Sequence, residues 1–196
     1  MSRRIDTMLG VAKALDECMR TESIERIRVN ALCREAGISR TTFYEYFDDI
    51  YGVATWMWDY LMSQTLYRCG IEWDCYEAHL RKFRILLRYR DFFANAYKVV
   101  GYVSVTQHGG RSMETHVREL VERKRGVPLS EDESLELEFF VTGAKHMTRH
   151  WAERGMKEGP ERMARLFTEF VPAFALPYLE PDPDFVPIHN VAVPLD

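Results

Sequence analysis

Hydrogen-bonding side chains are concentrated in one short segment of the chain, and their types suit contact with a nucleic acid. A guanidinium can donate to guanine edges or to a phosphate, and a phenol can donate to a phosphate. A threonine offers a hydroxyl group and a methyl group that fits thymine, whereas a carboxylate accepts from cytosine or repels phosphate. In chain order the segment contains Ser39, Arg40, Thr41, Thr42, Tyr44 and Glu45.

Two other groups of residues have spacings that suit metal binding or redox chemistry. His146 and His150 are four residues apart, but no carboxylate lies at ligand spacing, so we expect a polar stripe or a cavity lining and no metal site. Cys69 and Cys75 could form a redox switch, although their five intervening residues match no redox or zinc motif. We therefore expect reduced thiols, with Cys33 packed in a helix.

A basic stretch contains Arg81, Lys82, Arg84, Arg88 and Arg90, with 81, 84 and 88 on one helical face. Such a stretch is usually a solvated face, and the alternative is attraction for an anionic effector. The aromatic residues between Trp56 and Trp73 and between Tyr89 and Tyr102 are expected in the core, or around an apolar ligand pocket. No nucleophile–base pair or carboxylate dyad is apparent, so we expect neither an enzyme nor a cofactor.

The elements that position these residues are predicted to be helices, because apolar residues recur at three- and four-residue steps. A second helix should end at Gly37, and Ser39 should cap a third helix in which Phe43 and Phe47 face inward. A fourth helix should run from about Asp49 to Gln64. Later helices are expected at about 76–90, 91–100, 111–125, 131–154 and 160–171, which gives an all-α fold.

Residues 27–47 have the pattern of a helix-turn-helix, in which the later helix enters the major groove of DNA. With Phe43 and Phe47 inward, Arg40, Thr41, Tyr44 and Glu45 would face outward. The predicted DNA contacts are Arg28, Asn30, Ser39, Arg40, Thr41, Thr42, Tyr44 and Glu45.

The stretch AGISRTTFYEYF resembles the recognition segment of the TetR family of bacterial repressors, and the match extends over about residues 3–68. The stretch from Phe140 to Phe167 more loosely resembles TetR-like regulators of dihydroxyacetone kinase. The resemblance implies an N-terminal three-helix bundle with a helix-turn-helix at 1–47. It also implies a larger helical effector-binding and dimerisation domain, which we place at 48–176. A proline-rich extended tail would follow at 177–196.

Two positions depart from the family pattern. Ile50 stands where the family usually has a lysine that meets a DNA phosphate, and Asp48 and Asp49 precede it. Arg28 stands where the second helix usually begins with threonine, and it could restore a phosphate contact. The alternative to a DNA-binding regulator is therefore a TetR-like fold that acts as a co-regulator through another protein.

A homodimer is expected, because helix-turn-helix proteins usually bind two half-sites about 34 Å apart. Phe139 and Gly143 lie on a face partly distinct from the apolar stripe of the helix at 131–154. With the last helix they could form a four-helix interface, although both helices could equally complete the monomer's core. The candidate interface residues are Phe139, Gly143, Met147, Phe167, Phe170 and Phe174.

Charge limits how this chain could bind DNA. The net charge of its 196 residues is −4, so any contact must come from a local patch that dimerisation doubles. No apolar run reaches the ~18 residues of a membrane span, and no secretion signal is apparent. We expect a cytoplasmic homodimer that binds double-stranded operator DNA and an unknown small-molecule effector, as a repressor rather than an activator.

Overall fold

The structure is a computed structural model that describes residues 3–99 and 104–186. Its elements within these ranges are helices and no β-strand occurs there, so the predicted all-α fold is confirmed. The α-helices are α1 (Arg3–Met19), α2 (Val29–Ala36), α3 (Arg40–Tyr44), α4 (Ile50–Ser63), α5 (Cys75–Arg88), α6 (Arg90–Ala96), α7 (Val105–Arg125), α8 (Glu131–Glu153) and α9 (Pro160–Glu169). Two single turns of 3₁₀-helix are η1 (Leu66–Arg68) and η2 (Leu176–Tyr178).

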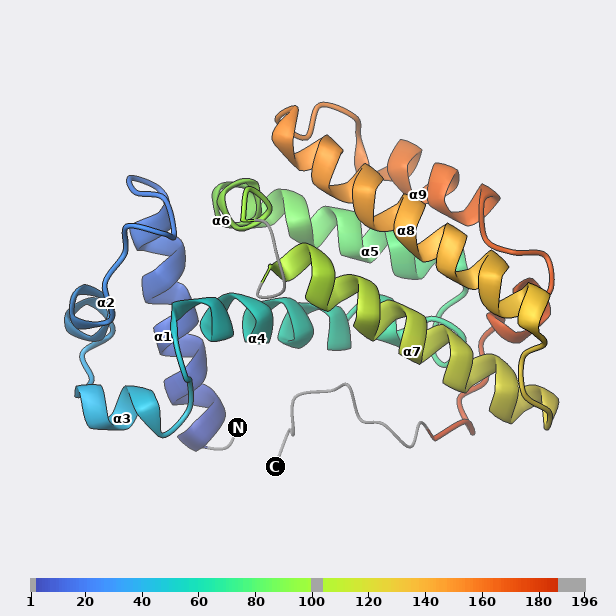
Figure 1. Cartoon of the computed structure of the whole chain (residues 1–196), viewed down its shortest axis with the longest axis horizontal. Helices are drawn as coiled ribbons and strands as arrows, with labels where there is room; N and C mark the ends of the chain where they lie inside the picture. The colour runs from blue at the N-terminus through green and yellow to red at the C-terminus, as the bar shows by residue number, and fades with distance from the viewer. Residues whose placement is uncertain (1–2, 100–103, 187–196) are drawn as a thin grey trace.

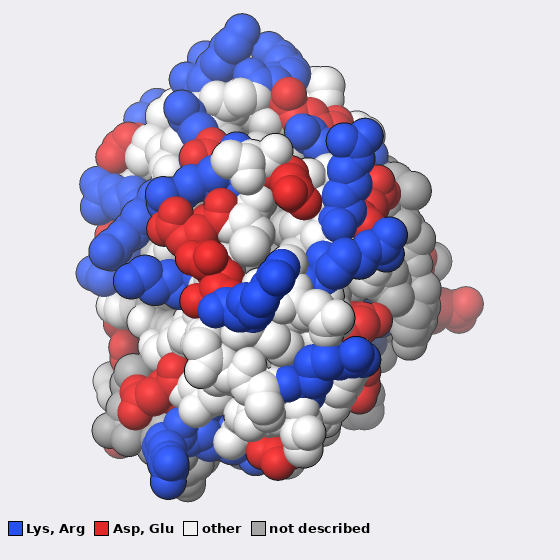
Figure 2. All heavy atoms as spheres, turned by 90° about the vertical axis from the view of Figure 1, so that its left-hand side faces the viewer, with Lys and Arg blue, Asp and Glu red and all other residues white. Residues whose placement is uncertain are grey.

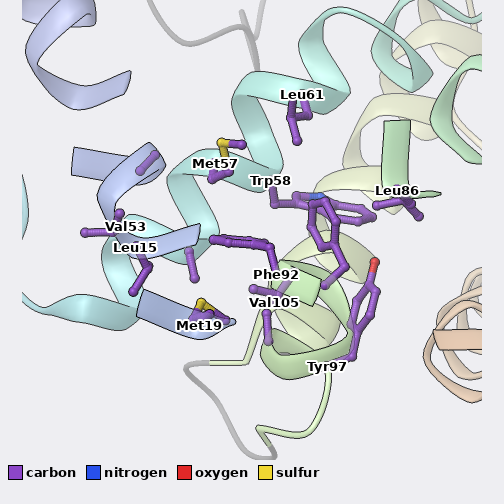
Figure 3. Close-up of a cluster of buried hydrophobic side chains, with 14 of the residues drawn as sticks. Leu15, Met19, Val53, Met57, Trp58, Leu61, Leu86, Phe92, Tyr97 and Val105 are labelled. Atoms are coloured by element: carbon purple, nitrogen blue, oxygen red, sulfur yellow. The ribbon is translucent and has the colours of Figure 1, made fainter. Parts of the chain in front are cut away.

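Helices α1 to α3 lie together at one end of the molecule, and α4 runs from them into the group formed by α5 to α9 (Figure 1). Leu15, Leu32 and Phe43 are fully buried among the first three helices, so each helix directs its apolar stripe into a shared core. A continuous cluster of buried side chains links this end to the larger group (Figure 3). It includes Leu15 and Met19 of α1, Val53, Met57, Trp58 and Leu61 of α4, Phe92 of α6, and Tyr97 and Val105 around the start of α7.

The larger group is built on the pairing of α5 with α9 and of α7 with α8 (Figure 1). The ring of Phe83 on α5 packs edge-to-face on Phe167 of α9 at 4.9 Å and on Trp151 of α8 at 5.2 Å. Helix α8 begins with a capping box in which Ser130 and Glu133 satisfy each other's backbone amides. The core of this group is therefore made by helices that are distant in the sequence.

Two helix boundaries differ from those predicted. Helix α7 begins at Val105 rather than at 111, although it contains Gly109 and Gly110, which have low helix propensity. A Cβ atom on Gly109 would lie 2.8 Å from the indole of Trp58, so close packing against α4 explains the glycine there. Helix α6 ends at Ala96 rather than at 100, and residues 100–103 lie outside the described residues.

The described part of the C-terminal segment packs against the rest of the chain. The Lys124 ammonium group donates to the carbonyl oxygens of Gly70 at 2.6 Å, Tyr178 at 3.0 Å and Glu180 at 3.1 Å. Leu179 is buried, and its neighbourhood contains η2 rather than fully extended chain. Residues 187–196 of the predicted tail lie outside the described residues. None of the helices described here is long and apolar enough to span a bilayer.

Candidate nucleic-acid interface, subunit face and ligand cavity

The turn between α2 and α3 has the geometry that the sequence predicts. Gly37 ends α2 in the left-handed region, with φ of 66°, and its amide donates to a carbonyl of the last helical turn. Ser39 begins α3 by accepting a hydrogen bond from the Thr42 amide at 3.0 Å. The Ser39 and Thr42 hydroxyl groups are also 3.0 Å apart. These two predicted DNA contacts are therefore already engaged in fixing the start of α3.

The short helix α3 separates an inward face from an outward face. Phe43 is completely buried, and its ring lies 5.7 Å from that of the buried Phe47. The structure brings the other four predicted contacts of this segment to the surface: Arg40, Thr41, Tyr44 and Glu45 are all exposed. The guanidinium carbon of Arg40 lies 5.7 Å from the centre of the Tyr44 ring. The two side chains therefore share one exposed face.

The remaining predicted DNA contacts lie at the start of α2. Arg28 and Asn30 are both exposed. Arg28 occupies the N-cap position with extended backbone angles, and its side chain makes no capping hydrogen bond because a guanidinium has no acceptor. The side chain of Arg28 is thus left to meet a phosphate.

The three residues that depart from the family pattern have structural roles at the start of α4. The Asp49 carboxylate accepts a 2.7 Å hydrogen bond from the Gly52 amide and so caps the helix. Ile50 is buried against the core, while Asp48 is exposed. The aspartate cap and the apolar anchor account for two of these residues, and neither provides a phosphate contact.

The charge on this end of the molecule is mixed. Figure 2 shows Lys and Arg side chains interspersed with Asp and Glu over the face formed by the N-terminal helices. No single-sign field covers that face, so contact with a polyanion would depend on individual basic side chains such as Arg28 and Arg40.

An exposed apolar groove lies between α8 and α9, where the sequence predicts contact between subunits. Phe139 and Phe170 are 84% and 70% exposed, which is unusual for phenylalanine. The groove has a volume of about 350 Å³. It is lined by Phe139, Phe140, Gly143, Ala144, Met147, Leu166, Phe167 and Phe170.

Two of the predicted interface residues are not surface side chains of this groove. Phe167 is only 4% exposed and packs against Phe83 within the monomer, so it forms the floor of the groove. Phe174 is half-buried and packs with the second core cluster, away from the groove. Conversely, Met147 was expected in the buried stripe of α8 as well as at the interface, and it is 40% exposed.

Lys82 does not belong to a solvated basic face. Arg81, Arg84 and Arg88 are exposed, but Lys82 is only 5% exposed and points into the protein. Its ammonium donates to the Thr148 hydroxyl at 3.3 Å. It also lies within 5 Å of the ring centres of Phe83 and Phe167. Burial lowers the pKa of Lys82 to about 7, because desolvation disfavours the charged amine.

Lys82 lines a cavity of about 40 Å³ between α4, α5, α7 and α8. Buried side-chain atoms without a hydrogen-bond partner in the described structure include the Trp58 indole nitrogen, the Tyr97 hydroxyl and the Thr106 hydroxyl, and all three residues line this cavity. Two of these residues, Trp58 and Tyr97, belong to the aromatic segments for which the sequence left a pocket open as an alternative.

The other candidate residues form smaller polar contacts. The Cys75 thiol lies 3.3 Å from His79 Nδ1, and a hydrogen bond from Cys69 lowers the pKa of Cys75. All four cysteines are free thiols. His146 and His150 are exposed, with ring centres 6.1 Å apart, and within residues 3–99 and 104–186 no group of three metal-ligating side chains occurs.

A capped helix-turn-helix followed by a larger helical group is an architecture of transcription regulators that bind DNA. Residues 74–172 match the family model described as a transcriptional regulator C-terminal region of the TetR type. This chain belongs to the TetR family of transcriptional regulators. No curated protein matches it by sequence.

Solved structures share this fold. One is described as the dihydroxyacetone kinase operon activator DhaS, with 16% sequence identity, a TM-score of 0.58, and coverage of 89% of this chain and 97% of that chain. Another is a TetR transcriptional regulator from Rhodococcus sp. RHA1, with 18% identity, a TM-score of 0.48, and coverage of 87% and 100%.

Proposed function

We propose that this TetR-family regulator binds a palindromic operator as a homodimer, with α3 in the major groove. The observation that carries the proposal is the exposed face of α3, where Arg40, Thr41 and Tyr44 stand over the buried Phe43. These side chains can donate to base edges and phosphates, whereas the phenylalanine fixes the orientation of the helix.

The groove between α8 and α9 supports the homodimer. Large exposed apolar patches mark interaction surfaces, and Phe139 and Phe170 are two neighbouring aromatic side chains on such a patch. The exposed Gly143 between them has no atom within 4 Å of an added Cβ, so another helix could approach its backbone. A two-fold pairing of α8 and α9 would form a four-helix interface.

The proposed effector would act through α6. Asn95 on this helix accepts a hydrogen bond from the Ile24 amide at 3.1 Å and donates to the carbonyl oxygens of Met19 and Glu22. Tyr97, two residues later, lines the cavity. A ligand that displaces Tyr97 would therefore shift the side chain that holds the α1–α2 loop. We propose that this movement changes the placement of α3 and releases a cytoplasmic repressor from its operator.

The recognition helix is tested by selecting bound duplexes from a random DNA library. The wild type should enrich a near-palindrome, and Arg40→Ala and Tyr44→Phe should each weaken its binding, by about 1–3 kcal/mol for Arg40→Ala if it contacts a base. Fluorescence anisotropy on the selected duplex gives the affinities.

Arg165→Ala is the matched control, because Arg165 is exposed on α9 at a distance from α3 in the chain. Its affinity should equal that of the wild type. No enrichment at low salt would contradict direct DNA binding and would favour a co-regulator that acts through another protein.

Asn95→Ala should lower the free energy of unfolding by about 1–3 kcal/mol, because the Ile24 amide and two backbone carbonyls lose their partner. Urea denaturation followed by circular dichroism measures the change. Asn30→Ala removes an exposed amide side chain and should have little effect on stability. Equal unfolding midpoints for Asn95→Ala and the wild type would show that α6 does not hold the α1–α2 loop.

A further inference from the structure

We propose that the cavity beside Lys82 binds a small organic anion, a carboxylate of a few heavy atoms, which pairs with the Lys82 ammonium group. This inference rests on the proposed ligand-responsive function and names the chemical class of its effector. It follows from the charge, the hydrogen-bonding capacity and the size of the cavity.

The charge of the cavity calls for an anion. The Lys82 ammonium has three N–H donors and makes one long hydrogen bond, to Thr148. Within the described residues no carboxylate lies within 4.0 Å of it, in contrast to Arg84, whose guanidinium pairs with Glu161 at 2.9 Å. A buried cation without a counterion is costly, and a bound carboxylate would supply that counterion together with two acceptor oxygens.

The unpartnered polar atoms around the cavity are suited to an acceptor. The Trp58 indole nitrogen can only donate, and it is buried without a partner in the described structure. The Tyr97 hydroxyl is also buried without a partner, and burial raises the pKa of Tyr97 well above its usual value, so this group stays protonated. Buried polar groups in native proteins normally have partners. The oxygens of a carboxylate could accept from both donors and from Lys82.

The lining of the cavity argues against a cationic ligand. Its ionisable members are His79, Lys82, Tyr97 and Lys145, and none of them is an acid. Lys145 directs its ammonium to Gln107, with the two atoms 3.2 Å apart, so its aliphatic stem rather than its charge lies beside the cavity at Gly110. The donors are therefore balanced by no acidic side chain of the lining.

The size of the cavity sets the size of the ligand. A site for one water needs roughly 10–15 Å³, so about 40 Å³ accommodates a few heavy atoms. Most of the wall is apolar and includes Leu66, Met113 and Val141, which suits a short alkyl group. Propionate has a carboxylate and an alkyl group of this size. Because so small a ligand makes few contacts, we expect a dissociation constant in the high micromolar to millimolar range.

Calorimetric titration of the full chain tests the inference, with sodium propionate, propionamide and sodium chloride as probes. Propionate should bind with one site per protomer, and propionamide and chloride at least tenfold more weakly. Lys82→Met keeps the length of the side chain without its charge and should weaken propionate binding at least tenfold. Tyr97→Phe should weaken it several-fold. Lys157→Met, which removes an exposed lysine between α8 and α9, should bind propionate as the wild type does.

Three results would overturn the inference: equal affinity for propionate and propionamide, unchanged propionate binding by Lys82→Met, or no propionate binding by the folded wild type. Operator binding by the same preparations separates this inference from the proposed function. A protein that binds its operator but not propionate has another effector class. A protein that binds propionate but no DNA has the anion site without the proposed regulatory output.

Discussion

At pH 6 the Lys82→Met variant is expected to be more stable than the wild type by roughly 3–5 kcal/mol. Burial lowers the pKa of Lys82 to about 7 from its ordinary value of 10.5, and a tenfold change in proton affinity is worth about 1.4 kcal/mol. Methionine fills a similar volume and needs no counterion, so it removes the cost of the buried charge.

The pH dependence of this difference has a definite sign. Because the folded-state pKa is lowered, the cost of the charged lysine is present in full below about pH 7. It declines as the pH rises from 7 to 10.5, because the amine is then already neutral in the folded protein. The wild type should therefore gain stability over this range, while Lys82→Met should not gain that increment.

Urea denaturation at several pH values, in chloride buffers without carboxylates, measures both effects. Lys157→Met serves as the control, since its exposed lysine should give a curve parallel to that of the wild type. Propionate added at pH 6 should stabilise the wild type and leave Lys82→Met unchanged. Wild-type and Lys82→Met curves that run parallel between pH 6 and pH 9 would mean that the ammonium group is solvated.

Phe139→Glu should convert the proposed homodimer into a monomer and lower operator affinity by at least about 100-fold. Phe139 is 84% exposed in the single chain, so the change should leave the monomer's fold intact. At an interface, the carboxylate would be buried without a partner, which is strongly unfavourable. A monomer also loses the gain that comes from binding two half-sites together.

Light scattering coupled to size-exclusion chromatography gives the mass, which should fall from twice 23.1 kDa to one copy. Anisotropy on the selected operator gives the affinity. Val127→Glu is the matched control, because Val127 is 53% exposed in the loop between α7 and α8, outside the groove. A dimeric Phe139→Glu protein would show that the subunits associate through another surface.

The N-terminal fold was predictable because local signals there agree with tertiary packing. The glycine and serine that end α2 and begin α3 act within a few residues, and Phe43 and Phe47 are spaced for one face of a helix. The exposure of Arg40 and Tyr44 follows directly from that spacing. Their proposed contact with DNA stays a prediction.

The start of α7 and the environment of Lys82 were not predicted, because both depend on distant residues. Gly109 is helical owing to its close packing on Trp58, about fifty residues earlier in the chain. Lys82 looked like one more charge in a basic stretch. It nevertheless lies three residues after the buried His79 and four before the buried Leu86, and that helical spacing was the available signal for a buried position.

The pairing of α5 with α9 affects how this chain emerges from the ribosome. Arg84 and Glu161, which join the two helices, are 77 residues apart. At about 5–20 residues per second, synthesis of the intervening chain takes roughly 4–15 s. During that interval the ring of Phe83 lacks its α9 partner, Phe167. Nascent chains that stall in this window should be the form of the protein most prone to aggregation and most in need of a chaperone.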